Sequence, residues 1–318
     1  MVQNNHIEIV AVGGGTGLST ILYGLKHISN DITAVVTVAD DGGSSGRLIA
    51  DFDILPPGDI RNCLVALAKE ETLMSSLFLY RFDRGDIRGH SFGNLLITAL
   101  SEITGDFISA IRQASSILNI KGKVLPSTLS KVSLEAELID GTEISGQSKI
   151  MKSPKPISRI RLVPADVPAM PDVIDSIKRA EFIILGPGSL FTSVLPNLLI
   201  REIIEAIEKS DATKIYICNV MTQNGETDGF SAQDHLAKIF EHSSNRVLDY
   251  IMVNNTVIPD DLIGAYLRED AHPVKYDVGG LERMGVKVIE DDLLNFSNLV
   301  RHDPAKVANS IKRHFSLK

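Results

Sequence analysis

The chain has 318 residues, of which 44% are hydrophobic, enough apolar material for one large core or two smaller ones. Its 40 acidic and 32 basic side chains give a formal net charge of −8, with no tryptophan and no long basic run. This balance lacks the basic stripe that nucleic-acid-binding surfaces leave, so we expect no nucleic-acid partner.

The first predicted elements form a strand–helix–strand unit. Residues 7–12 are apolar and β-branched and run directly into glycines, which indicates a buried strand. Residues 18–28 repeat apolar side chains at helical spacing, and Thr16 is the expected N-cap. A second apolar stretch over 32–39 ends at Asp40. This order of elements predicts a parallel sheet.

The next part of the chain, from about residue 60, contains no convincing strand pattern, and we expect helices over 64–68, 73–80, 95–103 and 107–118. Strict alternation over 131–138 and the turn signal Asp140-Gly141 then predict an inserted β-rich piece at 120–165. The α/β pattern resumes with strands over 182–185, 214–219 and 247–253 and a closing helix over 306–315. We therefore expect one α/β domain over 1–318, doubly wound around a mostly parallel sheet, with a helical excursion and a small β-hairpin subdomain.

Several classes of protein are excluded by what the sequence lacks. The two cysteines, Cys63 and Cys218, form no Cys-x-x-Cys, so neither a disulfide framework nor a zinc pattern is present. The start of the chain does not read as a signal peptide, and no apolar stretch reaches the ~18–20 residues of a membrane helix. We expect a cytoplasmic protein without membrane insertion, and its size and setting lead us to expect a homodimer.

The most informative feature is a set of loops rich in small polar residues. The first follows the first strand and consists of Gly13, Gly14, Gly15, Thr16 and Gly17. A helix that begins there presents unpaired N–H groups and positive partial charge, which suits a phosphate. The loop matches neither the full dinucleotide fingerprint, because Leu18 replaces its last glycine, nor a P-loop. A tight turn without a ligand is the alternative.

The acidic pair Asp40 and Asp41 ends the second strand. Asp40 lies 27 positions after Gly13, somewhat beyond the ~20 expected for an acid that binds ribose. Three interpretations remain open: ribose binding, Mg²⁺ binding by the pair, and a helix N-cap and turn. Asp40, Asp41 and His90 are the candidate catalytic residues.

The second flexible loop contains Gly42, Gly43, Ser44, Ser45 and Gly46, and Arg47 after it is a candidate phosphate donor. A surface linker is the alternative interpretation. A third motif, Pro57-Gly-Asp-Ile-Arg-Asn62, places Asp59 as the N-cap of a helix, with Arg61 and Asn62 toward the same crevice. In a fourth motif, His90 and Asn94 begin an apolar helix. There His90 either contacts ligand as a phosphate partner or proton carrier, or holds the loop in place.

Two further loops follow later strands. One contains Gly186, Gly188 and Ser189 and repeats the arrangement of the first loop; the other contains Asn219, Thr222, Gln223 and Glu226, whose polar groups suit sugar hydroxyls or a base edge. In open α/β sheets, ligands bind beyond the carboxyl ends of the strands, where the strand order reverses. We therefore expect these loops to converge on one crevice that holds a nucleotide with a diphosphate.

Taken together, the motifs resemble one family. Gly13-Gly-Gly-Thr-Gly-Leu-Ser19, Val36-Thr-Val-Ala-Asp-Asp-Gly-Gly-Ser-Ser-Gly-Arg47, Gly89-His-Ser-Phe-Gly-Asn94, Gly186-Pro-Gly-Ser-Leu-Phe-Thr-Ser193 and Cys218-Asn-Val-Met-Thr-Gln223 are similar to the bacterial gluconeogenesis factor family (YvcK type). That family lies within the CofD-like group, whose enzyme members are 2-phospho-L-lactate transferases that use Mg²⁺. The resemblance spans nearly the whole chain.

The resemblance implies a Rossmann-like fold and a cytoplasmic bacterial protein that binds UDP-sugars such as UDP-N-acetylglucosamine. It further implies a role in cell shape and wall integrity during growth on gluconeogenic carbon sources, exerted through a regulatory protein partner. Tyr266 and Arg301 lie in sequence segments that also resemble the family. Tyr266 is a candidate for stacking on uracil, and Arg301 is a candidate for pairing with a diphosphate. The alternatives are that Tyr266 is an aromatic residue on a helix face and that Arg301 is a solvated charge. A Mg²⁺-dependent transferase is the alternative function, and the missing third glycine disfavours an NAD(P)-dependent enzyme.

Overall fold

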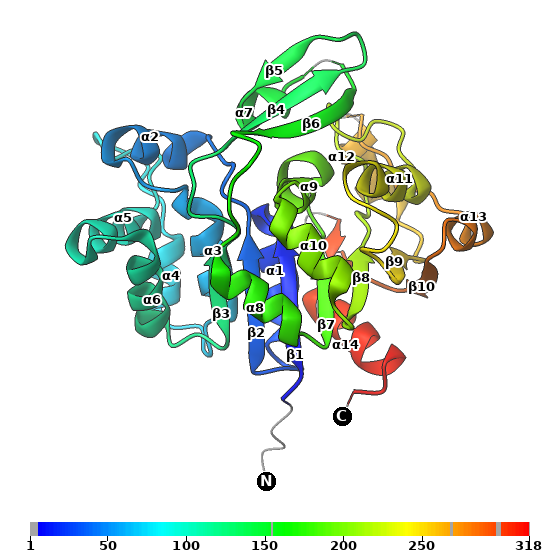
Figure 1. Cartoon of the computed structure of the whole chain (residues 1–318), viewed down its shortest axis with the longest axis horizontal. Helices are drawn as coiled ribbons and strands as arrows, with labels where there is room; N and C mark the ends of the chain where they lie inside the picture. The colour runs from blue at the N-terminus through cyan, green and yellow to red at the C-terminus, as the bar shows by residue number, and fades with distance from the viewer. Residues whose placement is uncertain (1–5, 154, 268–269, 297–299, 318) are drawn as a thin grey trace.

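The computed structural model describes residues 6–153, 155–267, 270–296 and 300–317. At its centre lies a seven-stranded sheet whose neighbouring strands all pair in parallel, in the order β10-β9-β8-β7-β1-β2-β3 (Figure 1). The strands are β1 (Glu8–Gly13), β2 (Asp31–Val36), β3 (Lys123–Pro126), β7 (Phe182–Leu185), β8 (Thr213–Ile217), β9 (Tyr250–Asn254) and β10 (Lys287–Asp291).

The strand order reverses between β1 and β7. From β1 the chain proceeds through β2 to β3 on one side, whereas β7 to β10 occupy the other side. This arrangement confirms the predicted doubly wound, Rossmann-like α/β class. It also fixes the switch point, the position at which such sheets bind ligands, between β1 and β7.

Helices cover both faces of the sheet. Their bounds are α1 (Gly15–Leu25), α2 (Gly43–Phe52), α3 (Pro57–Leu67), α4 (Leu73–Leu79), α5 (Phe92–Thr104), α6 (Phe107–Leu118), α8 (Pro171–Arg179), η1 (Leu190–Val194, a π-helix), α9 (Leu195–Leu198), α10 (Arg201–Lys209), α11 (Ala232–His242), α12 (Asp260–Leu267), α13 (Val278–Arg283) and α14 (Pro304–His314). The helical excursion predicted from about residue 60 is therefore present as α3 to α6, and α2, which was not predicted, precedes it.

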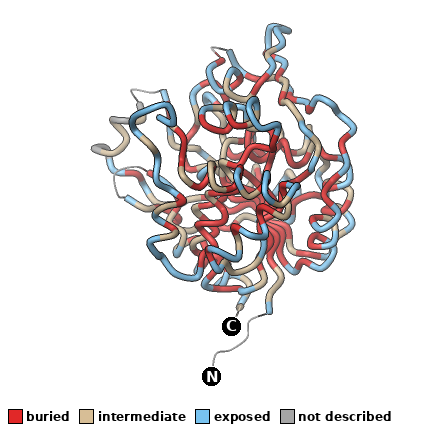
Figure 2. The backbone as a smooth tube through the Cα atoms, turned by 90° about the vertical axis from the view of Figure 1, so that its left-hand side faces the viewer, coloured by how far each residue is buried: buried red, intermediate tan, exposed pale blue. Residues whose placement is uncertain are grey.

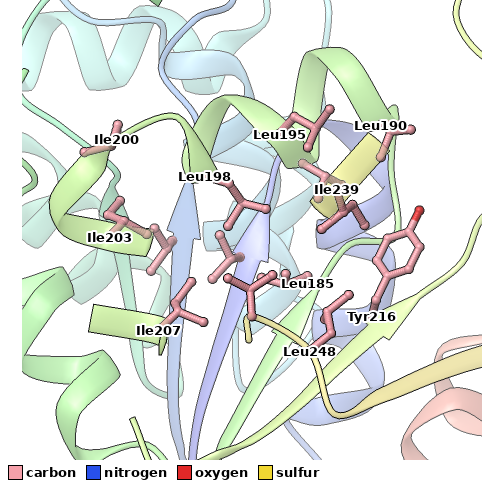
Figure 3. Close-up of a cluster of buried hydrophobic side chains, with 14 of the residues drawn as sticks. Leu185, Leu190, Leu195, Leu198, Ile200, Ile203, Ile207, Tyr216, Ile239 and Leu248 are labelled. Atoms are coloured by element: carbon pink, nitrogen blue, oxygen red, sulfur yellow. The ribbon is translucent and has the colours of Figure 1, made fainter. Parts of the chain in front are cut away.

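The core consists of two apolar layers, one on each face of the sheet. Because side chains alternate along a strand, Val10 and Val12 of β1 enter one layer and Ile9 and Ala11 enter the other. The first layer packs against α8 to α11 and the second against α1, α3, α5, α6 and α14. Buried backbone is concentrated in the centre of the molecule (Figure 2), and Figure 3 shows side chains of the first layer meeting over β7 and β8.

A three-stranded antiparallel sheet stands over the carboxyl ends of the parallel strands (Figure 1). We call this unit the cap, residues 133–163; it comprises β4 (Ser133–Leu138), β5 (Glu143–Ser145), α7 (Gln147–Ile150) and β6 (Ile157–Val163). The β-rich piece was expected over 120–165, and this predicted start is too early. Strand β3 pairs with β2 and therefore belongs to the main sheet, not to the cap.

One local expectation is corrected, and some elements were not predicted. Residues 43–46 are not a flexible loop but the first turn of α2, which buries Ser44, Ser45 and Leu48. The edge strand β10 and the short ribbon of β11 (Leu294–Asn295) with β12 (Arg301–His302) were not predicted. Within the described part of the chain, no helix combines the length and apolar character that a membrane span requires.

Candidate functional site

A cavity of about 390 Å³ opens at the carboxyl ends of β1 and β7, at the switch point. Its walls come from the loops after β1, β7 and β8, from residues 300–302, and from α7 of the cap. The predicted site residues that line it are Gly14, Gly15, Thr16, Gly17, Gly188, Ser189, Asn219, Gln223 and Arg301. The expected convergence of strand-following loops therefore holds for the loops after β1, β7 and β8.

The loop after β1 leads directly into α1. The helix begins at Gly15, so Gly14 rather than Thr16 is its N-cap. The Gly15 N–H donates to the Asp59 carboxylate at 2.6 Å. N–H groups in the first turn of a helix have no acceptor within that helix, and here the first turn lines the cavity. This wall therefore presents backbone donors and the positive end of a helix dipole to a ligand.

Asp59 supports the loop after β1 from behind. It was expected to cap α3, but α3 begins at Pro57, and the Asp59 carboxylate instead reaches Gly15. Burial raises the pKa of Asp59 to about 6, against the lowering effect of the hydrogen bond from Gly15. The sequence pattern identified a functional loop residue but assigned it to the wrong helix.

The loop after β7 is held by polar side chains that follow β8. Gly188 N–H donates to Asn219 Oδ1 at 3.1 Å, and Asn219 Nδ2 donates back to Gly188 O at 2.8 Å. Gln223 Nε2 donates to Ser189 Oγ at 2.9 Å. Asn219 and Gln223 thus line the cavity while they fix the shape of its second glycine loop.

Glu226 lies behind this second loop, in the interior. It is 2% exposed, and its Oε1 accepts a hydrogen bond from Thr192 Oγ1 at 3.0 Å. Burial raises the pKa of Glu226 to about 7. Thr222 is also buried and ties its loop to His272. Neither Glu226 nor Thr222 lines the cavity, so both act on the loops and not on a ligand directly.

Three motifs expected at the crevice meet instead in one buried network between α2, α3 and α5. Arg61 Nη1 donates to Asn94 Oδ1 at 2.8 Å, and Asn94 Nδ2 donates to Ser44 Oγ at 3.2 Å. Ser44 Oγ lies 3.0 Å from His90 Nδ1, and Arg61 Nη2 donates to Asn62 Oδ1. None of these residues lines the cavity.

Burial shifts the pKa values of two ionisable side chains in this network, Arg61 and His90. Burial, and then the charge of Arg81, lowers the pKa of Arg61 to about 10. Burial and the charge of Arg47 lower the pKa of His90. A buried guanidinium that lacks its acceptors is costly, so the amide of Asn94 stabilises the packing of α3 against α5. The interpretation that His90 holds its loop in place agrees with this geometry.

We expect Asn94→Ala to lower the free energy of unfolding by about 1–3 kcal/mol, because it removes two buried hydrogen bonds, one from Arg61 and one to Ser44. Chemical denaturation monitored by circular dichroism measures the change. Ser116→Ala, at an exposed position of α6, is the control and should change stability by less than about 0.5 kcal/mol. An Asn94→Ala protein as stable as the parent would contradict the network's role.

The acidic pair after β2 also lies outside the cavity lining. Asp40 Oδ1 accepts from Gly42 N at 3.0 Å, and burial raises the pKa of Asp40. Asp41 Oδ1 accepts from Ser148 N of the cap at 2.9 Å. Arg47 is exposed and donates to Arg88 O. Among the described residues, no group of three His, Cys, Asp or Glu side chains is arranged to hold a metal ion.

The remaining predicted residues have structural neighbours. Gly13 ends β1, and Gly186 N donates to Val12 O beside it. The Tyr266 hydroxyl accepts from Val300 N at 2.7 Å and donates to Val300 O, so it anchors the segment that carries Arg301 and does not itself line the cavity.

Sequence reasoning missed several lining residues, among them Thr20, Gln147, Met151, Thr192, Ser193 and His302. Gln147 and Met151 reach the cavity only through the fold of the cap, and no local pattern marks them. His302 is buried with Nε2 3.1 Å from Cys218 O, and burial lowers its pKa to about 4. Its place in the sequence next to Arg301, a predicted ligand contact, was the feature that could have identified His302 as a lining residue.

Comparisons with known proteins agree with this architecture. The model of the family described as 2-phospho-L-lactate transferase CofD matches residues 9–294. The chain is 49% identical over 304 residues to the gluconeogenesis factor of Bacillus subtilis, with 95% of this chain and 96% of that protein covered. For the gluconeogenesis factor of Listeria monocytogenes the identity is 44% over 313 residues, with 98% and 96% covered.

A solved crystal structure points the same way. A protein from Bacillus halodurans superposes with a TM-score of 0.93 at 48% sequence identity, with 96% of this chain and 98% of that chain covered. Sequence and fold thus agree over nearly the full length. The chain belongs to the CofD family and, within it, to the gluconeogenesis factors.

Proposed function

We propose that the protein binds a UDP-sugar of the UDP-N-acetylglucosamine type in the cavity at the switch point. The observation that carries this proposal is the pairing of two glycine loops, one after β1 and one after β7, across a single opening. The first turn of α1 offers backbone donors of the kind that a diphosphate requires, whereas the Gly188 N–H of the second loop is already bonded to Asn219. The volume, about 390 Å³, lies within the range of small-molecule sites.

The charge of the cavity supports an anionic ligand. Of the described residues that line it, Arg301 carries a fixed positive charge and none is acidic. His302 is held neutral by burial, which lowers its pKa to about 4. The other lining side chains are neutral, and their amides and hydroxyls suit sugar hydroxyls and the edge of a base. This composition favours a nucleotide-sugar over a bare polyphosphate.

The biological role we propose is that of a cytoplasmic gluconeogenesis factor that reports the supply of nucleotide-sugar. The names of the relatives support the first part of this role. The protein would pass the signal to a regulatory protein partner and so maintain cell shape and wall integrity on gluconeogenic carbon sources. A strain whose only copy carries a binding-deficient variant should lose its normal shape on such sources and keep it on glucose.

Isothermal titration calorimetry with UDP-N-acetylglucosamine, GDP and NAD tests the ligand class. We expect binding of the UDP-sugar without Mg²⁺ and without turnover. Arg301→Ala should weaken that binding about ten- to a hundredfold, the loss expected for a charge-assisted hydrogen bond. Arg283→Ala, at an exposed arginine of α13, is the control and should leave the affinity unchanged. Binding of GDP alone, or of NAD alone, would contradict the proposal.

A Mg²⁺-dependent transferase of phosphorus-containing groups is the second candidate, favoured by the family model. Asp40 and Asp41 would hold the metal together with phosphate oxygens. Their fit to such a site is poor, because Asp40 Oδ1 and Asp41 Oδ1 each accept a backbone N–H and neither residue lines the cavity. Metal-dependent product formation would decide for this candidate.

A further inference from the structure

We propose that Asp41 is a positioning residue that clamps the cap over the cavity, and that through this clamp it sets the place of Gln147 against the ligand. The effect on ligand rests on the proposed function; the clamp itself does not. Among the described residues of the cap, only Gln147 of α7 and Met151 directly after it line the cavity.

The clamp is a direct contact between two parts of the chain that are 107 positions apart. Asp41 Oδ1 accepts a hydrogen bond from Ser148 N at 2.9 Å. Ser148 follows Gln147 directly, so the bond fixes the backbone next to a lining residue. Asp41 belongs to the segment between β2 and α2, outside the cap.

The two surfaces also fit closely around this hydrogen bond. A methyl group added at Gly146 would collide with the Asp41 carboxylate, and one added at Gly42 would lie 2.8 Å from Ser148 Oγ. In both cases the nearest atom belongs to a side chain, and Gly146 also has a φ of 100°, which favours glycine. The Asp41 residue is exposed overall, but its carboxylate lies against Gly146 and accepts the Ser148 N–H of the cap.

Gln147 is the residue whose place the clamp determines. It lines the cavity opposite the loops after β1 and β7, and its Oε1 is buried without a hydrogen-bond partner among the described residues. A buried carbonyl that lacks a donor is costly, so a ligand hydroxyl or amide that supplies the donor is favoured. The sugar part of a nucleotide-sugar carries such groups.

The alternative role for Asp41 is that of a metal ligand, and the two roles predict different results for one substitution. Asparagine retains an oxygen that accepts from Ser148 N but carries no charge, so Asp41→Asn should preserve the clamp. Alanine removes the acceptor. A metal ligand would instead be impaired by both substitutions, because Mg²⁺ prefers charged carboxylates.

The clamp is tested first without ligand, by hydrogen–deuterium exchange of the cap in the full-length protein. We expect Asp41→Ala to accelerate exchange at the Ser148 amide about tenfold, the factor for the loss of one hydrogen bond. Asp41→Asn should exchange within about twofold of the parent. The control is Asp140→Ala, which removes an exposed aspartate within the cap that accepts the Thr142 N–H and pairs with Lys155, and so perturbs the cap without touching the clamp. Unchanged exchange in Asp41→Ala would overturn the clamp.

The effect on ligand is tested second, by titration with UDP-N-acetylglucosamine. We expect about tenfold weaker binding for Asp41→Ala, and parent-like binding for Asp41→Asn and Asp140→Ala. Faster exchange with unchanged affinity would overturn the role of the clamp in binding. Equal loss in Asp41→Asn and Asp41→Ala, accompanied by loss of a Mg²⁺ effect, would show a metal ligand instead. If the parent itself binds no UDP-sugar, the proposed function fails while the exchange result still decides the clamp.

Discussion

Gly17→Ala should abolish measurable UDP-sugar binding and lower the free energy of unfolding by about 1–3 kcal/mol, the usual cost of overpacking. Gly17 lies where the loops after β1 and β7 meet. A methyl group there would overlap the Pro187 carbonyl and lie 2.8 Å from Gly188 Cα. Both obstacles are backbone, so the two loops must separate, and the cavity between them loses its shape. Calorimetric titration and thermal unfolding measure the two effects.

The matched control for Gly17→Ala is Gly122→Ala, directly before β3. A methyl group at Gly122 would overlap the Ile32 carbonyl oxygen, a backbone clash at the end of the sheet away from the cavity. It should cost comparable stability and leave the affinity of the remaining folded protein unchanged. Parent-like affinity in Gly17→Ala, or equal loss of affinity in both variants, would disprove the local explanation.

Glu226→Gln should stabilise the protein at alkaline pH by up to about 3 kcal/mol and have little effect near pH 4.5. Burial raises the pKa of Glu226 to about 7, so the folded state holds a proton that the unfolded chain has released. Stability from this group is therefore fully present below about pH 4.5 and is lost as pH rises through about 7. Glutamine is neutral at every pH and removes that loss.

Urea denaturation at pH 5, 7 and 8.5 measures the effect, with Glu102→Gln at an exposed position of α5 as the control. Part of the pH dependence should remain in Glu226→Gln, because burial also raises the pKa of Asp59, to about 6. A Glu226→Gln protein that loses stability at pH 8.5 would show that the charged form of Glu226 is needed.

The predictable part of the fold was the part encoded by local periodicity. Short apolar runs predicted β1, β2, β7, β8 and β9, and the rule for carboxyl ends then located the cavity. The edge strands β3 and β10 were harder to find, because they are short and β10 is half-exposed. Helix α2 was missed because glycine and serine have low helix propensity, and burial of Leu48 outweighs it.

The site, like the fold, was predictable only where a local sequence pattern marked it. Loop composition identified residues that hold anions or helix ends but did not say toward which element they turn. Asp59 and Ser44 were therefore expected at a ligand, whereas Asp59 supports Gly15 and Ser44 joins Asn94. Gln147 was invisible because the antiparallel cap carries it over the cavity from a distant part of the sequence.

The segment 300–302 and helix α14 have a consequence for how the protein acquires its activity. Val300, Arg301 and His302 complete the wall of the cavity, and α14 then packs on α1, the helix whose first turn forms the opposite wall. The segment 300–302 therefore completes a pocket that residues 14–17 begin. A chain cut before residue 300 would lack part of that wall, so the nucleotide-sugar proposed to bind there would stabilise uncut molecules selectively and protect them from proteolysis.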